Sequence, residues 1–269
     1  MNEAELVFTE VLNCSRASLY LDKDIVLDKS RSALLSSIFE RRVTAEPIQY
    51  ILGKAEFMGL PFIVNKNVFI PRPETEVLVE IALKKANEIV SLGASHLKIL
   101  DLGTGSGCIA ISLAKFLPCA KITGVDISQE VLKTALANAR LNNVAEKTTF
   151  IESDLFTQFS VSNTQYDIII SNPPYIPAAE IESLQPEVKF EPRIALDGGL
   201  DGLDFYRNIA RESSRYLNKR GLLIMEMGFE QRASIERIFE RSENFQIQEV
   251  IMDYNNIDRV LVIRKKSID

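Results

Sequence analysis

Four consecutive residues, Asn172-Pro173-Pro174-Tyr175, could together hold a planar NH2 group. Proline has no backbone N–H, so the two central positions offer carbonyl acceptors without donors. The Asn172 side-chain oxygen and the Pro173 carbonyl could accept the two hydrogens, while Tyr175 stacks on the planar group. We therefore expect all four residues to bind substrate, with direct catalytic roles for Asn172, Pro173 and Tyr175.

The chemistry that this arrangement favours is methyl transfer to a planar nitrogen. An amide nitrogen is a poor nucleophile because its lone pair is delocalised into the carbonyl, whereas a sulfonium methyl donor is a strong electrophile. Positioning for in-line attack can supply up to roughly 7–11 kcal/mol in favourable intramolecular cases, so a resident base is not obligatory. The alternative interpretation is a Pro-Pro turn that merely ends a strand.

A second candidate site is the glycine-rich segment DLGTGSGCIAI (101–111), which follows an apolar run and opens a helix. Open α/β sheets bind ligands at such turns, where glycine lets the backbone bend tightly and approach the ligand. The spacing is GxGxG, and Cys108 stands where the dinucleotide-binding GxGxxG pattern needs its third glycine. This departure argues against NAD or FAD.

Two carboxylates follow the next predicted strands. Asp126 could accept hydrogen bonds from both ribose hydroxyls of a nucleoside, since Ser128 is better placed to cap the following helix. Asp154 could accept from an adenine amino group, with Leu155 or Phe156 against the ring, although an ordinary turn aspartate is as good an interpretation. Together with the glycine-rich segment, these residues predict a nucleoside-binding site.

The segments that carry this chemistry must be positioned by a sheet, because each of them follows a short β-rich run. Five such runs alternate with helical ones, at LKILDL (97–102), KITGVDI (121–127), TTFIES (148–153), YDIIIS (166–171) and GLLIMEM (221–227). This alternation predicts a parallel sheet with helices on both faces. Residues 245–252 and 259–265 are separated by about six residues, too few for a helical crossover, and should pair antiparallel. A mostly parallel sheet with an antiparallel C-terminal hairpin is the Rossmann-like α/β architecture of class I methyltransferases.

The residues before this sheet have a different pattern. Apolar residues recur at helical spacing between residues 3 and 53, which predicts a small N-terminal helical domain over 1–53. Short apolar stretches over 54–70, split by glycine, proline and asparagine, predict a β-hairpin connector. Pro71 and Pro73 mark the start of the main domain, 71–269, whose first helix we expect over about 74–91. The helical domain contributes nothing to the nucleoside site, so we expect it to recognise the substrate.

Composition narrows the class of protein further. Hydrophobic residues make up 46% of the 269 residues and charged residues 25%, which is ordinary for a globular protein. The net charge of −6 argues against nonspecific binding to nucleic acid. No apolar run approaches the ~20 residues that span a bilayer, so we expect a cytoplasmic protein without a membrane partner. Cys14, Cys108 and Cys119 lack metal-ligand spacing and are expected to be buried thiols; no metal site is predicted.

The residues resemble those of a known family, the HemK/PrmC-type protein N5-glutamine methyltransferases, and especially the peptide chain release factor enzymes. The likeness covers nearly the whole chain, in the order EPIQYILGKAEFMGLPF (46–62), IPRPETE (70–76), DLGTGSGCIAI (101–111), NPPYIP (172–177) and EPRIALDGGLDGLDFYR (191–207). One departure lies in DYNNIDR (253–259), where Asn256 replaces the family's glycine; asparagine is the next best residue for a left-handed turn.

The resemblance implies a cofactor, a substrate and a set of binding residues. The cofactor would be S-adenosylmethionine, with S-adenosylhomocysteine as the product. By the resemblance it would contact Gly103, Thr104, Gly105, Ser106, Gly107, Asp126, Leu155 and Asn172. Asp154 joins this set from its place after the third predicted strand. The substrate would be the glutamine of the GGQ loop of a release factor, received by Asn172 to Tyr175. No direct nucleic-acid substrate is expected, and the enzyme is expected to be a monomer.

Three alternatives share parts of this pattern. Glutamine methylation of a ribosomal protein would use the same NPPY segment. A nucleic-acid adenine-N6 methyltransferase would also use NPPY, but it would ordinarily need a basic surface or an extra domain, which neither the charge nor the length supplies. A noncatalytic nucleotide-binding module would leave NPPY unexplained.

Overall fold

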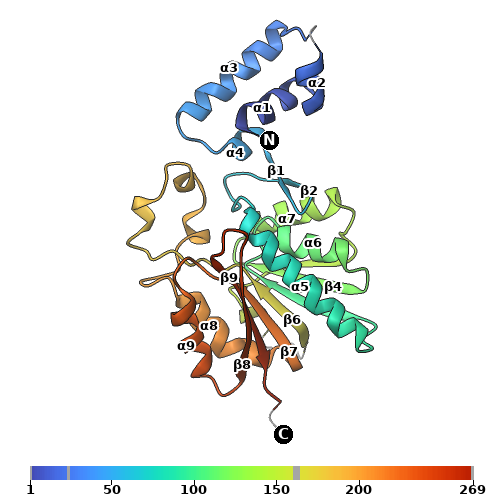
Figure 1. Ribbon diagram of the computed structural model, residues 1–269, viewed down its shortest axis with the longest axis vertical. Coiled ribbons are helices and arrows are strands. Elements are labelled where there is room, and N and C mark those ends of the chain that lie inside the picture. The colour runs from blue at the N-terminus through green and yellow to red at the C-terminus, as the bar shows by residue number, and fades with distance from the viewer. Residues whose placement is uncertain (1, 23–24, 160–163, 268–269) are drawn as a thin grey trace.

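The computed structural model describes residues 2–22, 25–159 and 164–267. Its first helices form a separate unit beside the α/β body (Figure 1). They are α1 (Glu3–Leu12), α2 (Arg16–Leu21), α3 (Lys29–Val43) and α4 (Ile48–Leu52). The unit has a small core of its own, formed by Val7, Val11, Leu35, Ile38 and Ile48.

A β-hairpin joins the helical unit to the body. Strands β1 (Lys54–Phe57) and β2 (Leu60–Ile63) pair antiparallel across a two-residue turn. Both turn residues, Met58 and Gly59, have positive φ, which matches the twist of a tight hairpin. Phe57 and Phe62 are buried in the core of the body, so the hairpin is anchored to the sheet domain.

The body is built on a seven-stranded sheet with the order β5-β4-β3-β6-β7-β9-β8. Its strands are β3 (Leu97–Leu102), β4 (Ala120–Asp126), β5 (Thr148–Glu152), β6 (Tyr166–Ser171), β7 (Leu217–Glu226), β8 (Phe245–Met252) and β9 (Asp258–Lys265). Strands β3 to β7 are parallel, and β9 runs antiparallel to both β7 and β8. The predicted fold class is therefore confirmed, including the antiparallel C-terminal hairpin.

Helices cover both faces of this sheet (Figure 1). One face packs on α5 (Pro73–Ser91), α6 (Cys108–Phe116) and α7 (Gln129–Leu141), and the other on α8 (Asp204–Glu212) and α9 (Arg232–Glu240). Alternate residues of β6 enter the two cores: Ile168 and Ile170 face the first, and Ile169 faces the second. The short 3-10 helices are η1 (Thr157–Phe159), η2 (Ile181–Ser183), η3 (Val188–Phe190), η4 (Arg193–Ala195) and η5 (Ser213–Arg215).

Several local predictions can be compared with the structure. Ser128 caps α7 by accepting a hydrogen bond from the Val131 amide, as predicted. Asn256 adopts the left-handed conformation, with φ 61°, so asparagine accommodates the turn. The prediction for the thiols was partly wrong, because only Cys108 is buried and both Cys14 and Cys119 are partly exposed. No helix in the described ranges is both long and apolar enough to cross a bilayer.

Candidate active site

A cavity of about 360 Å³ lies at the carboxyl ends of the parallel strands, where α/β sheets bind ligands. Its lining joins the glycine-rich loop to the NPPY segment. The predicted residues that line it are Gly103, Thr104, Gly105, Ser106, Asp126, Asp154, Leu155, Asn172, Pro173, Pro174 and Tyr175. The two sites that the sequence predicted separately therefore form one continuous space.

The glycine-rich loop is held in shape by carboxylates beneath it. Thr104 donates its hydroxyl hydrogen to Asp101 at 2.6 Å, and the Gly105 amide donates to Asp126 at 3.0 Å. Gly103 and Gly105 have φ of 70° and 56°, a conformation that strains other residues. Gly107 does not line the cavity. It begins α6 with φ 82°, and a Cβ there would press on Ile111 and Ala135, so this glycine serves helix packing.

Asp126, at the end of β4, is partly buried but accepts two backbone hydrogen bonds, and these two effects act on its pKa in opposite directions. Burial raises the pKa of its carboxyl group, while hydrogen bonds from the backbone amides of Gly105 and Ser128 lower it. Oδ2 accepts from Gly105 and Oδ1 from Ser128, at 3.2 Å. Each carboxylate oxygen has a second acceptor position, so Asp126 can brace the loop and still receive ribose hydroxyls.

Leu155 and Phe156, the two residues predicted to lie against an adenine ring, have different environments after β5. Leu155 lines the cavity and holds a left-handed backbone, with φ 47°. Phe156 is buried instead and stacks on Tyr216, with ring centroids 4.8 Å apart. Of the two residues that could lie against a ligand ring, Leu155 is therefore the available one, and Phe156 is a core residue. Asp154 is exposed at the cavity wall.

Asn172 presents its amide with a defined polarity. Its Nδ2 donates to Thr75 Oγ1 at 3.1 Å, and its side chain lies beside the Glu226 carboxyl group, whose pKa it lowers. The amino side of the amide is therefore occupied by the protein, which leaves the oxygen for a ligand. This is the polarity needed to accept an N–H hydrogen from a planar NH2 group.

The backbone after Tyr175 is held by the loop 196–203. Ile176 donates to the carbonyl of Leu196 at 3.0 Å, and the Gly198 amide donates back to the Ile176 carbonyl at 2.9 Å. Gly202 has φ 75°, and a Cβ there would collide with the Tyr175 carbonyl oxygen. Only glycine therefore permits this approach.

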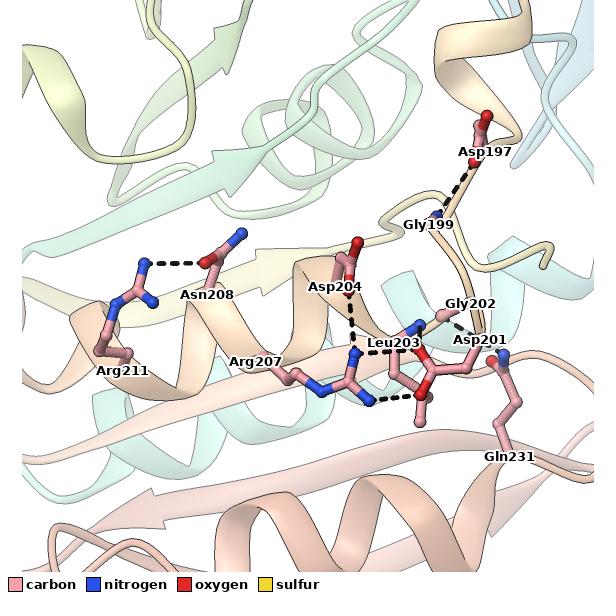
Figure 2. A network of polar contacts seen from close by, with 10 residues as sticks. All are labelled: Asp197, Gly199, Asp201, Gly202, Leu203, Asp204, Arg207, Asn208, Arg211 and Gln231. Atoms are coloured by element: carbon pink, nitrogen blue, oxygen red, sulfur yellow. Dashed lines mark hydrogen bonds and ion pairs between the residues drawn. The ribbon is translucent and has the colours of Figure 1, made fainter. Parts of the chain in front are cut away.

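A polar network fixes the shape of that loop (Figure 2). Asp197 accepts from the Gly199 amide at 3.0 Å, and Asp201 forms an ion pair with Arg207 on α8. Arg207 also donates to Asp204 at 2.9 Å. These contacts fix the loop to the first turn of α8, and the loop in turn holds the backbone that follows the NPPY segment.

An ion pair between two distant motifs lies at the rim of the cavity. Arg72, beside the start of α5, pairs with Glu191, and the Ile70 amide donates to the same carboxylate at 3.0 Å. Burial raises the pKa of Glu191, and the Arg72 charge lowers it. Arg72 lines the cavity and lies over the Phe69 ring, 4.6 Å from its centroid. The pair ties residues 69–72 to the segment before η4.

Comparison with known proteins agrees with this geometry. Residues 75–185 match the "Methyltransferase small domain" family, and residues 1–53 match the "PrmC N-terminal domain" family. A release factor glutamine methyltransferase from Geobacter sulfurreducens is 42% identical over 260 residues, which cover 96% of this chain and 87% of that protein. One from Thermodesulfovibrio yellowstonii is 38% identical over 268 residues, 99% of this chain and 93% of that protein. This chain belongs to the release factor glutamine methyltransferase family.

Solved structures show the same fold at lower sequence similarity. A ribosomal protein L11 methylase from Lactobacillus delbrueckii subsp. bulgaricus superposes with a TM-score of 0.53 at 21% identity, covering 75% of this chain and 82% of that one. A putative class I S-adenosylmethionine-dependent methyltransferase from Listeria monocytogenes gives a TM-score of 0.51 at 17% identity, covering 74% and 64%. The α/β body of this release factor glutamine methyltransferase family member therefore has the class I methyltransferase fold.

Several site residues of this family member were not predicted from the sequence as site residues. Thr75 on α5, Glu226 on β7 and Gln231 at the start of α9 lie against the NPPY segment. Glu191, before η4, pairs with Arg72 at the cavity rim. Thr75 lies in the IPRPETE segment and Glu191 begins the EPRIALDGGLDGLDFYR segment. Their place in these family-like segments was the one sequence signal that could have marked them as site residues. Glu226 and Gln231 lie outside those segments, and their sequence neighbourhood gives no comparable sign.

Proposed function

We propose that this protein transfers the methyl group of S-adenosylmethionine to the side-chain amide nitrogen of the glutamine in the GGQ loop of a peptide chain release factor. The observation that carries the proposal is the polarity of Asn172, whose Nδ2 hydrogen-bonds into the protein and leaves Oδ1 for the substrate. Family membership supports the choice of a glutamine amide and of a release factor.

The lining of the cavity fits S-adenosylmethionine by its donor set. Asp126 has spare acceptor positions for ribose hydroxyls, Leu155 offers an apolar surface for a ring, and Asp154 offers an acceptor at the wall. We assign residues 103–106, Asp126, Asp154, Leu155 and Asn172 to the cofactor. Gly107, which does not line the cavity, serves the packing of α6. When bound, the cofactor would supply a sulfonium methyl group, the electrophile of the reaction.

The chain's own residues then have to hold the nucleophile. Asn172 Oδ1 and the Pro173 carbonyl would each accept one hydrogen of the glutamine NH2 group, which fixes the nitrogen lone pair in direction. Tyr175 would pack against the planar amide. Burial raises the pKa of Tyr175 to about 12, so its ring stays uncharged throughout the physiological range. The Arg72–Glu191 pair would brace the cavity rim beside this site.

We further propose that the N-terminal helical domain, 1–53, recognises the release factor. Several large apolar side chains are exposed on it, among them Tyr20, Leu21, Phe39 and Val43. Phe39 and Val43 lie one turn apart on α3, so their exposed side chains share one helix face that a protein partner could cover. An Arg42–Glu187 ion pair of 3.0 Å connects this domain to the segment at the cavity rim, so a substrate bound there would lie near the site. Such a substrate implies a cytoplasmic enzyme.

The decisive experiment offers S-adenosylmethionine labelled in its methyl group to a mixture of release factor, ribosomal proteins, DNA and RNA. We expect label in the release factor, and its loss when the GGQ glutamine is replaced by alanine. Label in a ribosomal protein would assign the enzyme to the sister reaction. Label in nucleic acid alone would refute the proposal.

A further inference from the structure

Glu226 is a buried carboxylate next to the site that does not line the cavity. It ends β7, its side chain is 2% exposed, and its Oε2 has no hydrogen-bond partner in the described part of the chain. Within the same residues it forms no ion pair, because Arg259 pairs with Asp253 instead. Burying a carboxylate without a paired cation is costly, so its presence beside a site indicates a function.

The contacts of Glu226 lead to the amide of Asn172. The side chains of Thr75 and Asn172 lie beside the Glu226 carboxyl group, where their hydrogen-bonding capacity lowers its pKa, and Asn172 Nδ2 donates to Thr75 Oγ1 at 3.1 Å. These three residues come from β7, α5 and the end of β6. They form a chain of polar contacts that reaches the cavity only at Asn172 and Thr75.

The hydrogen-bonding properties of Glu226 and Thr75 determine the direction of the Asn172 amide. An amide can rotate by 180° and exchange its oxygen and nitrogen at almost no steric cost. An ionised carboxylate is an acceptor only, so it accepts hydrogen bonds from Nδ2 and repels Oδ1. The Thr75 hydroxyl can donate its one hydrogen to the carboxylate and then accept from Nδ2 as well.

From these contacts, and on the basis of the proposed function, we infer that Glu226 and Thr75 are positioning residues, which hold the Asn172 amide with Oδ1 toward the substrate nitrogen. Neither residue takes part in the chemical step through a bond to substrate or cofactor. Their role is to prevent the flipped amide, which would present an NH2 group to another NH2 group and leave the nucleophile without an acceptor.

Charge is the essential property of Glu226 in this role. Burial raises the pKa of its carboxyl group to about 7. Hydrogen bonding by Thr75 and the charge of Arg259 on β9 act in the opposite direction and lower the pKa. Glu74 on α5 raises it further, and Tyr175 and Tyr206 also face the group. Below pH 7 the protonated carboxyl could donate to Asn172 Oδ1 and favour the flipped amide. The methylation rate should therefore fall as the pH drops through about 7.

A positioning role and a structural role predict opposite effects on stability. The pKa of Glu226 in the folded state lies above its usual value of 4.5, so the folded protein is destabilised by this group as pH rises from about 4.5 to 7. Glu226→Gln removes that cost. At pH 8 the variant should therefore melt no lower than wild type while turning over more slowly, whereas loss of a structural contact would lower both.

The experiment compares wild type with Glu226→Gln, Thr75→Val and a control, Thr148→Val, in single-turnover methylation of the release factor. Thr148 is a buried threonine at the start of β5 whose hydroxyl donates to the Val144 carbonyl at 3.2 Å. We expect the rate at saturating substrates to fall about tenfold in both site variants, the equivalent of one charge-assisted hydrogen bond. Affinity for S-adenosylmethionine should change less than about twofold. The control should keep the wild-type rate, and the pH dependence should flatten in Glu226→Gln.

The outcomes separate this inference from the proposed function. If wild type labels an acceptor other than a release factor, the proposed function fails, and the variants are compared on that acceptor. If wild type labels none, nitrogen-15 NMR of the Asn172 NH2 group decides: its resonance should titrate with Glu226 in wild type and not in Glu226→Gln. Wild-type rate and pH profile in Glu226→Gln, an Asn172 resonance insensitive to pH, or rate losses matched by equal losses of stability would overturn the inference.

Discussion

The side-chain amide of Gln231 donates to the backbone carbonyl of Tyr175 at 2.8 Å, while its oxygen accepts from the Gly228 amide at 3.1 Å. One residue at the start of α9 thus joins the end of β7 to the last residue of the NPPY segment. Gln231 Nε2 also lies 3.4 Å from the Gly202 carbonyl (Figure 2). Gln231 therefore connects the backbone at Tyr175 to the backbone at Gly202 and at Gly228.

Replacing Gln231 by glutamate should disturb the substrate segment without affecting the cofactor loop. The variant keeps the acceptor for Gly228 but places a carboxylate against the Tyr175 carbonyl, which loses its donor. An unsatisfied buried acceptor costs about 1–3 kcal/mol, so we expect turnover to fall by roughly tenfold or more. Calorimetry should give unchanged affinity for S-adenosylmethionine. Gln248→Glu, at an exposed position of β8, is the matched control and should behave as wild type.

Asn172→Ala should abolish most of the methylation while the protein stays folded. The variant loses the acceptor that fixes one hydrogen of the substrate amide, and misplacement by ~1 Å can cost on the order of 100-fold in rate. Asn172→Asp keeps an acceptor and should retain more activity than alanine. Its carboxylate would, however, lie near that of Glu226, so its activity should stay below wild type. Single-turnover rates of the three proteins give the comparison, and an alanine variant within about threefold of wild type would exclude positioning by Asn172.

Asp126→Ala should weaken binding of S-adenosylmethionine. Each hydrogen bond to a charged group contributes about 1.5–3 kcal/mol, so loss of the ribose contacts should lower affinity tenfold or more. Glu152→Ala is the control, because Glu152 ends β5 opposite Asp126 in the register and is exposed outside the cavity. Equal affinities in the Asp126 variant and wild type would show that another acidic residue binds the ribose.

Recognition by the helical domain can be tested on its surface. Phe39 and Val43 lie one turn apart on α3, and their side chains are 49% and 87% exposed. Changing both to glutamine keeps helix propensity and removes apolar contact area. We expect kcat/KM for the intact release factor to fall about tenfold or more, as for a binding hot spot, with no change for a short GGQ peptide. Leu92→Gln, exposed at the end of α5, serves as control. An equal loss with the peptide would place the effect in the catalytic site.

The sequence by itself predicted the features that depend on neighbours in the chain. Asn172 to Tyr175 carry their acceptors in four successive residues, and the glycine spacing of 103–107 encodes a turn by backbone sterics alone. The strand-and-helix alternation gave the parallel sheet, because right-handed crossover connections leave few topologies. The carboxyl ends of parallel strands meet at one edge, so both sites could be expected there.

Tertiary structure decided which side chains meet these segments. Thr75 precedes Asn172 by 97 residues, yet the two side chains are hydrogen-bonded because α5 packs across the sheet near the end of β6. Strand β9 inserts between β7 and β8, and Arg259 on it reaches the Met227 carbonyl just beyond Glu226. Such contacts depend on strand order and helix packing rather than on local spacing. The acceptor atoms of the site are therefore visible in the sequence, whereas the direction in which Asn172 presents its oxygen depends on residues that only the folded chain brings to it.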